Sequence, residues 1–203
     1  MNCRGIIRIF GLSVFLTLGI SIPHLGAATP MEEIKTTADQ VMKILNEPKL
    51  KGESNKSARR EKLRQVILPR FDFAEMGKRA LGRHWSRNPE KQSEFVEAFQ
   101  QLLEDSYAEQ IEGAKGDKVV YINERTEQGF AEVNTKVISP NGEETPVNYK
   151  LHRVGSDWKV YDVVIANVSL VNNYRSQFNR LLANGSLDEL IKRIKEKRIQ
   201  KAS

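Results

Sequence analysis

The chain has 203 residues, a net charge of +6 and one cysteine. This length suffices for one domain with its own hydrophobic core, and one cysteine excludes an intramolecular disulfide or a cysteine-rich metal site. The basic residues are spread along the chain among acidic ones, without the interleaved aromatic side chains typical of a nucleic-acid-binding surface. We therefore expect no nucleic acid as partner.

The N-terminal 28 residues have the pattern of a secretory signal peptide. Arg4 and Arg8 form a positive region, residues 9–22 are apolar or small, and residues 26–28 (GAA) suit a cleavage site. The apolar run is shorter than the about 20 residues that a membrane span needs. We expect residues 1–28 to be removed, which takes away two arginines and leaves a mature chain of about +4. The expected location is the periplasm.

Four segments with helical spacing of apolar residues follow. The first begins at Thr29-Pro30 and ends before Pro48, and the second, which is basic, ends at Pro69. Asp72 has the position of an N-cap for the third helix, with an acid three residues later. We expect the fourth helix to be capped at Asn88-Pro89. Its apolar face is formed by Phe95, Val96, Phe99, Leu102, Leu103, Tyr107 and Ile111.

The apolar period changes from 3.6 to 2 at Lys118, which predicts β-strands. We expect Val120 and Ile122 to form the apolar face of the first strand, and three further runs are separated by short turns. The last run, 158–165, is apolar on both sides, so we expect it away from an open edge. The pattern predicts a four-stranded antiparallel meander with one dry face.

Two further helices are predicted after the strands. The first follows Ser169, and Ser186 has the position of an N-cap for the second. Helices before and after a run of strands predict an α+β fold, with the helices on one face of the antiparallel sheet. We expect one domain over residues 29–195 and a charged tail over 196–203.

The sequence contains no motif of a known catalytic or cofactor site. HExxH, GxSxG, the P-loop and the dinucleotide fingerprint are all absent. His152 falls on the polar side of its strand, which predicts a solvated side chain, and His84 lies at a helix end. Asp162 is the one carboxylate with apolar neighbours in a strand, and pairing with Arg153 or another cation explains it better than acid catalysis. These observations predict that the protein is not an enzyme.

Five stretches of the mature chain carry a family resemblance: 71–76 (FDFAEM), 80–85 (ALGRHW), 95–103 (FVEAFQQLL) with Tyr107, 158–165 (WKVYDVVI), and 167–171 (NVSLV) with 174–178 (YRSQF). Together they resemble the MlaC family, also called toluene-tolerance auxiliary proteins. The likeness covers essentially the whole mature chain in order. The chain departs from the family at Ala166, where members often carry an acid, and at Asn167, where they often carry glycine.

The resemblance implies a soluble periplasmic phospholipid carrier that works as a monomer. Its cargo would pass between an outer-membrane lipoprotein–porin complex and an inner-membrane transporter with an MCE-domain ring and an ABC ATPase, which maintains outer-membrane lipid asymmetry. The acyl chains would lie between sheet and helices, in a hydrophobic pocket enclosed by the N- and C-terminal helices. Apart from the phospholipid cargo, no cofactor is implied.

The residues expected to bind lipid are the apolar side chains of these helix and sheet faces. They are Met76, Leu81, Phe99, Leu103 and Tyr107 from the helices, and Val133, Val137, Tyr149, Leu151, Val160 and Val164 from the sheet. Three further residues are expected to reach the headgroup: Tyr161, Tyr174 and Arg175.

Two other functions remain open at this point. The first is an exported adaptor with a fully packed core and no ligand. The second is a small enzyme on a cone-like α+β scaffold, since a fold alone does not define a function. Such an enzyme would need a polar pair inside the pocket, and Asp162 and His84 are the available candidates.

Overall fold

The computed structural model describes residues 28–197. Apart from Ala28, the predicted signal peptide lies outside these residues, as does the end of the charged tail. Among residues 28–197, no helix is both long enough and apolar enough to cross a membrane.

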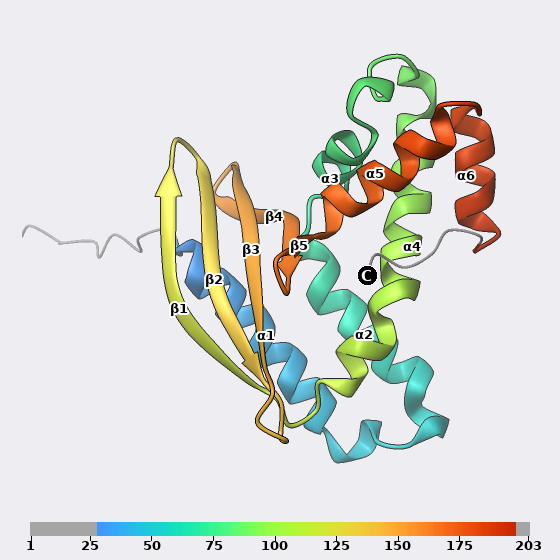
Figure 1. Ribbon diagram of the computed structural model, residues 1–203. Coiled ribbons are helices and arrows are strands. Elements are labelled where there is room, and N and C mark those ends of the chain that lie inside the picture. Colours follow the sequence, from blue (N-terminus) through green and yellow to red (C-terminus); the bar gives the residue numbers. More distant parts are fainter. Residues whose placement is uncertain (1–27, 198–203) are drawn as a thin grey trace, which may run out of the picture.

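The described chain forms a curved antiparallel sheet with helices on one face, as the sequence predicts (Figure 1). The strands follow one another in the order β1-β2-β3-β4-β5. Their bounds are β1 Lys118–Glu127, β2 Phe130–Ile138, β3 Glu144–Val154, β4 Asp157–Ile165 and β5 Val168–Ser169. The two-residue β5 is an addition to the predicted four strands, and it is too short to leave a periodic signal.

The predicted helices are all present, and short 3-10 turns lie between the first four. Their bounds are α1 Pro30–Asn46, α2 Lys56–Ile67, α3 Phe73–Leu81, α4 Gln92–Gly113, α5 Leu170–Leu182 and α6 Leu187–Lys195. The Thr29 side chain caps α1 by accepting from the N–H of Glu32, and the Glu32 carboxylate accepts in turn from the N–H of Thr29. Asp72 caps α3. Asn88 does not cap α4, because a 3-10 turn intervenes and the Asn88 side chain instead donates to the carbonyl of His84.

An aromatic cluster packs α4 against α5 at one end of the molecule. The rings of Phe99 and Tyr174 meet edge to face at 5.3 Å between centroids, and Phe178 contacts both Phe95 and Phe99 in the same way. All four side chains are fully buried. Edge-to-face pairs add to the stabilisation that comes from burial, so this end of the fold is firmly packed.

The apolar face of β1 differs from the prediction. Val120 and Ile122 lie on the outer face of the sheet and are 43% and 56% exposed, whereas Val119 and Tyr121 point inward. The sequence is apolar at both parities here, so alternation alone did not identify the inner face. Beyond an irregularity at Ile122, Glu124 accepts a hydrogen bond from the backbone N–H of Met31 in the first turn of α1.

As predicted, the strand β4 is not the last strand of the sheet. Its last two residues, Val164 and Ile165, pair with β5, while the carbonyl of Val160 accepts a bond from the N–H of Asp72 at 2.9 Å. A β-bulge at Tyr161 changes the strand's parity, because Leu151 pairs with Val160 whereas Lys150 pairs with Asp162. The inward side chains are therefore Val160, then Val163 and Ile165.

The turn between β4 and β5 is strained at Ala166. Ala166 has φ 48° and Asn167 has φ 68°, in the left-handed region that costs a residue with a Cβ about 1–2 kcal/mol. Asparagine tolerates this region better than alanine because its short polar side chain can form local hydrogen bonds.

We expect Ala166→Gly to raise the free energy of unfolding by about 0.5–1 kcal/mol, because glycine removes the steric cost at positive φ. Urea denaturation measures the change. The matched control is Ala183→Gly at the exposed end of α5, where φ is −64° and the same substitution should destabilise. Equal destabilisation by both variants would show that Ala166 is not strained.

Candidate functional site

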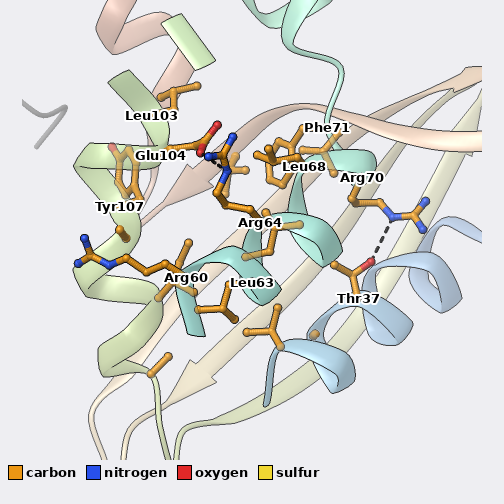
Figure 2. Close-up of a pocket in the computed structure, with 18 of the residues that line it drawn as sticks. Thr37, Arg60, Leu63, Arg64, Leu68, Arg70, Phe71, Leu103, Glu104 and Tyr107 are labelled. Carbon is orange, nitrogen blue, oxygen red and sulfur yellow. Dashed lines mark hydrogen bonds and ion pairs between the residues drawn. The ribbon is translucent and has the colours of Figure 1, made fainter. Parts of the chain in front are cut away.

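A cavity of about 870 Å³ lies between the sheet and the helices α1, α2 and α4 (Figure 2). This volume is in the upper part of the range for small-molecule sites, about 300–1,000 Å³. Most of the wall is apolar. Helix α5 contributes only Leu170 and α6 contributes nothing, so the N-terminal helices and α4 enclose the cavity rather than the two chain ends together.

The two halves of the 22-residue helix α4 lie in different surroundings. Its first half carries Phe95 and Phe99 into the aromatic cluster, whereas in its second half Tyr107 and Ile111 face the cavity. The residues of the second half keep partial exposure because the cavity lies in front of them. The same apolar stripe is thus core at one end and cavity wall at the other.

Six of the residues predicted to bind lipid lie on the cavity wall: Met76, Leu103, Tyr107, Val137, Tyr149 and Val160. Four others lie fully buried in the core and do not reach the cavity: Leu81, Phe99, Val133 and Leu151. Val164 is also absent from the wall, because the bulge in β4 gives the inward positions to Val163 and Ile165.

The three residues expected at the headgroup lie in separate places, and none lines the cavity. Tyr174 is fully buried in the aromatic cluster, and Arg175 is exposed on α5 next to Gly82. Tyr161 lies on the outer face of the sheet, where the guanidinium of Arg79 is 4.1 Å from its ring centroid. Alternation from the inward Val160 places Tyr161 on this face, and the bulge changes the face only of the residues that follow it.

Several wall residues were not selected from the sequence. They are chiefly Ile34, Ala38, Val41 and Met42 of α1, Leu63 and Ile67 of α2, Phe71 and Phe73 near the start of α3, and Val119, Val147, Val163 and Ile165 of the sheet. The α1 residues follow the helical spacing i, i+4, i+7, i+8, which was recognised as an apolar face. A face that packs in a core and one that lines a cavity have the same periodicity.

Ion pairs connect α2 to α4 beside the cavity (Figure 2). Glu112 accepts from Arg59 at 2.6 Å and from Arg60 at 2.8 Å, and Arg64 bonds Glu104 at 2.9 Å. Burial alone would raise the pKa of Glu112, but the hydrogen bonds from Arg60 and Arg59 outweigh it and hold the pKa below its ordinary value.

The tyrosines of the cavity wall stay neutral over the physiological range. Tyr149 is surrounded by protein and is exposed only towards the cavity, and desolvation raises its pKa to about 12. Burial also raises the pKa of Tyr107. The wall therefore holds hydroxyl groups that can form hydrogen bonds and that carry no charge near neutral pH.

The candidate catalytic residues do not meet in the cavity. Asp162 accepts from the Ser169 hydroxyl at 2.6 Å and from the N–H of Val171 at 3.1 Å, and its nearest cation is Lys150 at 3.9 Å rather than Arg153. It therefore fixes the start of α5. Neither Asp162 nor His84 lines the cavity.

The outer histidine is less solvated than predicted. The His152 ring bonds the carboxylate of Asp72 at 2.9 Å and its side chain is 19% exposed, although the strand parity is as expected.

Within residues 28–197, no three His, Cys, Asp or Glu side chains are grouped so that they could hold a metal ion.

The chain is similar to known proteins over most of its length. The family model described as MlaC protein matches residues 35–196. The toluene tolerance protein ttg2D of Pseudomonas putida is 25% identical over 93% of this chain and 86% of its own. The intermembrane phospholipid transport system binding protein MlaC of Haemophilus influenzae is 25% identical over 92% of this chain and 89% of its own.

A solved structure has the same fold. It is the phospholipid-binding protein from Ralstonia solanacearum in complex with a phospholipid, with a TM-score of 0.74 and 29% identity. The match covers 83% of this chain and 96% of that one.

We expect Glu112→Gln to lower the free energy of unfolding at neutral pH by about 1–3 kcal/mol, because two guanidinium groups lose a charged acceptor. The folded-state pKa of Glu112 lies below the ordinary 4.5, so its contribution is present above pH 4.5 and is lost as the pH falls through the folded value. Urea denaturation of both proteins at neutral and acidic pH measures this.

The control is Glu109→Gln on the same helix, whose exposed side chain has no hydrogen bond or ion pair among the described residues. A Glu112→Gln effect that stays constant down to pH 3 would contradict the assigned ion pair.

Proposed function

Because the chain belongs to the MlaC family, we propose that it is a periplasmic carrier that binds a phospholipid by its acyl chains. The observation that carries this proposal is the apolar cavity of about 870 Å³ between sheet and helices. The phospholipid bound in the Ralstonia solanacearum structure of the same fold supports it.

The size of the cavity matches the cargo. A water molecule occupies about 30 Å³ in the liquid. A methylene group is of similar size, so 870 Å³ has room for on the order of 30 methylenes. That is the content of two acyl chains. We therefore propose that one diacyl phospholipid is the cargo unit.

The hydrophobic effect explains why a carrier is needed. Each methylene removed from water is worth about 0.8 kcal/mol, so two acyl chains of roughly 30 methylenes resist entering water by about 24 kcal/mol. A cavity lined by side chains such as Val41, Leu103 and Val137 offers an equivalent environment without covalent chemistry. Release then needs a partner that opens the cavity or offers an equally favourable site.

We propose that the partners are the complexes that the family resemblance implies. One is an inner-membrane transporter with an MCE-domain ring and an ABC ATPase, and the other is an outer-membrane lipoprotein–porin complex. The name of the Haemophilus influenzae relative, a binding protein of an intermembrane phospholipid transport system, supports this. The proposed carrier works as a monomer and needs no nucleotide site of its own.

The two alternatives have less support. In a ligand-free adaptor, side chains are expected to fill the space between sheet and helices, whereas here α1, α2 and α4 line a large cavity. An enzyme needs a reactive pair in the cavity, and the two candidates, His84 and Asp162, lie elsewhere. Membership of a family of lipid-binding transport proteins also favours the carrier.

The direct test is native mass spectrometry of the protein purified from the periplasm, followed by lipid extraction. We expect one diacyl phospholipid per chain. A protein that carries no lipid, and that also takes up none from phospholipid vesicles, would contradict the carrier and favour the ligand-free adaptor.

The location of the cargo is tested with Leu103→Arg and Val137→Arg, which place a cation on the cavity wall. Bound lipid should fall at least tenfold, because a charge among the acyl chains is strongly unfavourable. Val120→Arg is the matched control for Val137→Arg, since Val120 lies on the outer face of the same sheet. Folded cavity variants that keep the wild-type amount of lipid would show that the chains bind elsewhere.

A further inference from the structure

The charged residues of the cavity wall are concentrated where α2 faces α4. Lys56, Arg60, Glu61 and Arg64 lie on α2, and Glu104 and Asp105 lie on α4. The side chains of Arg60 and Arg64 are also 38% and 47% exposed. Side chains that border both the cavity and the solvent mark the place where the cavity opens, so we assign its mouth to this edge.

The arginines around the cavity differ in how many of their N–H groups are used. Arg70 bonds the hydroxyl of Thr37, the carbonyl of Trp158 and the carboxylate of Glu33. Arg59 is similarly occupied, with Glu112 and two backbone carbonyls as acceptors. Both are structural, and neither has a free edge for a ligand.

Arg60 and Arg64 use only some of their N–H groups. Arg60 uses Nε and Nη2 on Glu112, and Arg64 uses Nε on Glu104. A guanidinium has five N–H donors, so Nη1 of Arg60 and both Nη groups of Arg64 have no acceptor among the described residues. The nearby Glu109 and Glu53 act on Arg60 through their charge, without a hydrogen bond to it.

We propose that Arg60 and Arg64 bind the phosphate group of the lipid whose acyl chains fill the cavity. The inference rests on the proposed function and adds the chemistry of headgroup recognition to it. The two side chains are four residues apart on α2, hence neighbours on one face, with Cβ atoms about 6 Å apart. One phosphodiester can therefore contact both, and guanidinium groups match phosphate oxygens in geometry and charge.

The carboxylates of α4 prepare this site. Glu112 and Glu104 hold the two arginines at the mouth through Nε and, for Arg60, Nη2, so the unused N–H groups are positioned before lipid arrives. The site recognises the phosphate common to phospholipids and leaves the rest of the headgroup in solvent. It should therefore favour any diacyl phospholipid over a lipid that has the same chains and no phosphate.

The test uses mixed vesicles with equal amounts of dioleoyl phosphatidylglycerol and dioleoylglycerol, which differ in the phosphate-bearing headgroup. Full-length mature protein is incubated with them, recovered and analysed by lipid mass spectrometry. Wild type should be enriched in phosphatidylglycerol at least tenfold. The double variant Arg60→Gln and Arg64→Gln should lose this enrichment and still take up lipid.

Arg87→Gln is the control, because Arg87 is an exposed arginine outside the cavity wall and should leave the enrichment unchanged. If the double variant does not fold, Arg64→Gln alone keeps the test, since Arg64 is the more exposed of the two and should still lower the enrichment severalfold.

The outcomes separate the two proposals. A wild type that binds both lipids equally, or a folded double variant that keeps the enrichment, would overturn the phosphate site and leave the carrier intact. A wild type that binds neither lipid would overturn the carrier itself. A titration with inorganic phosphate should show no binding at millimolar concentration. Tight binding of phosphate that leaves the lipid enrichment unaffected would instead mean a free-phosphate site.

Discussion

The aromatic cluster between α4 and α5 anchors the helices at one end of the molecule. It buries Phe95, Phe99, Tyr174 and Phe178 at one end of the molecule and fixes the first half of α4 there. A 22-residue helix is about 33 Å long, so the second half of α4 extends well beyond this anchor. Helix α1 lies on the sheet, whereas α4 lies farther from it (Figure 1). The cavity is lined by residues of both helices and of the sheet.

The two ends of the helical layer are held by different forces. At the aromatic end, large apolar surfaces are buried in rigid edge-to-face contacts. At the cavity end, α2 meets α4 through Arg60–Glu112 and Arg64–Glu104, whose arginines are partly exposed. Their carboxylates are largely buried, since Glu112 is 11% and Glu104 is 14% exposed, and Glu112 also accepts from Arg59. Removing one partner of such a pair leaves a buried charge without its partner, which is costly. The aromatic end is thus held by apolar burial and the cavity end by charged hydrogen bonds between α2 and α4.

The fold was largely predictable because its elements are amphipathic and clearly bounded. Caps at Thr29, Asp72 and Ser186 and the change of period at Lys118 lie where the structure has the corresponding boundaries. The cavity was less predictable. Whether an apolar side chain meets another side chain or an open space depends on how far apart two helices stand, which is a tertiary property. Phe99 and Tyr107 share one stripe of α4, yet only Tyr107 lines the cavity.

A single backbone irregularity accounts for the misplaced Val164 of β4. Tyr161 lies on the outer face, beside Arg79 and His152, and the bulge at this residue turns Val163 and Ile165 inward in place of Val164. Without the extra residue, Asp162 would keep the inward parity of Val160 and place a carboxylate towards the apolar wall. With it, Asp162 instead accepts from Ser169 and the N–H of Val171 at the start of α5. The bulge thus keeps this part of the cavity apolar while tying the sheet to the helix that carries the aromatic cluster.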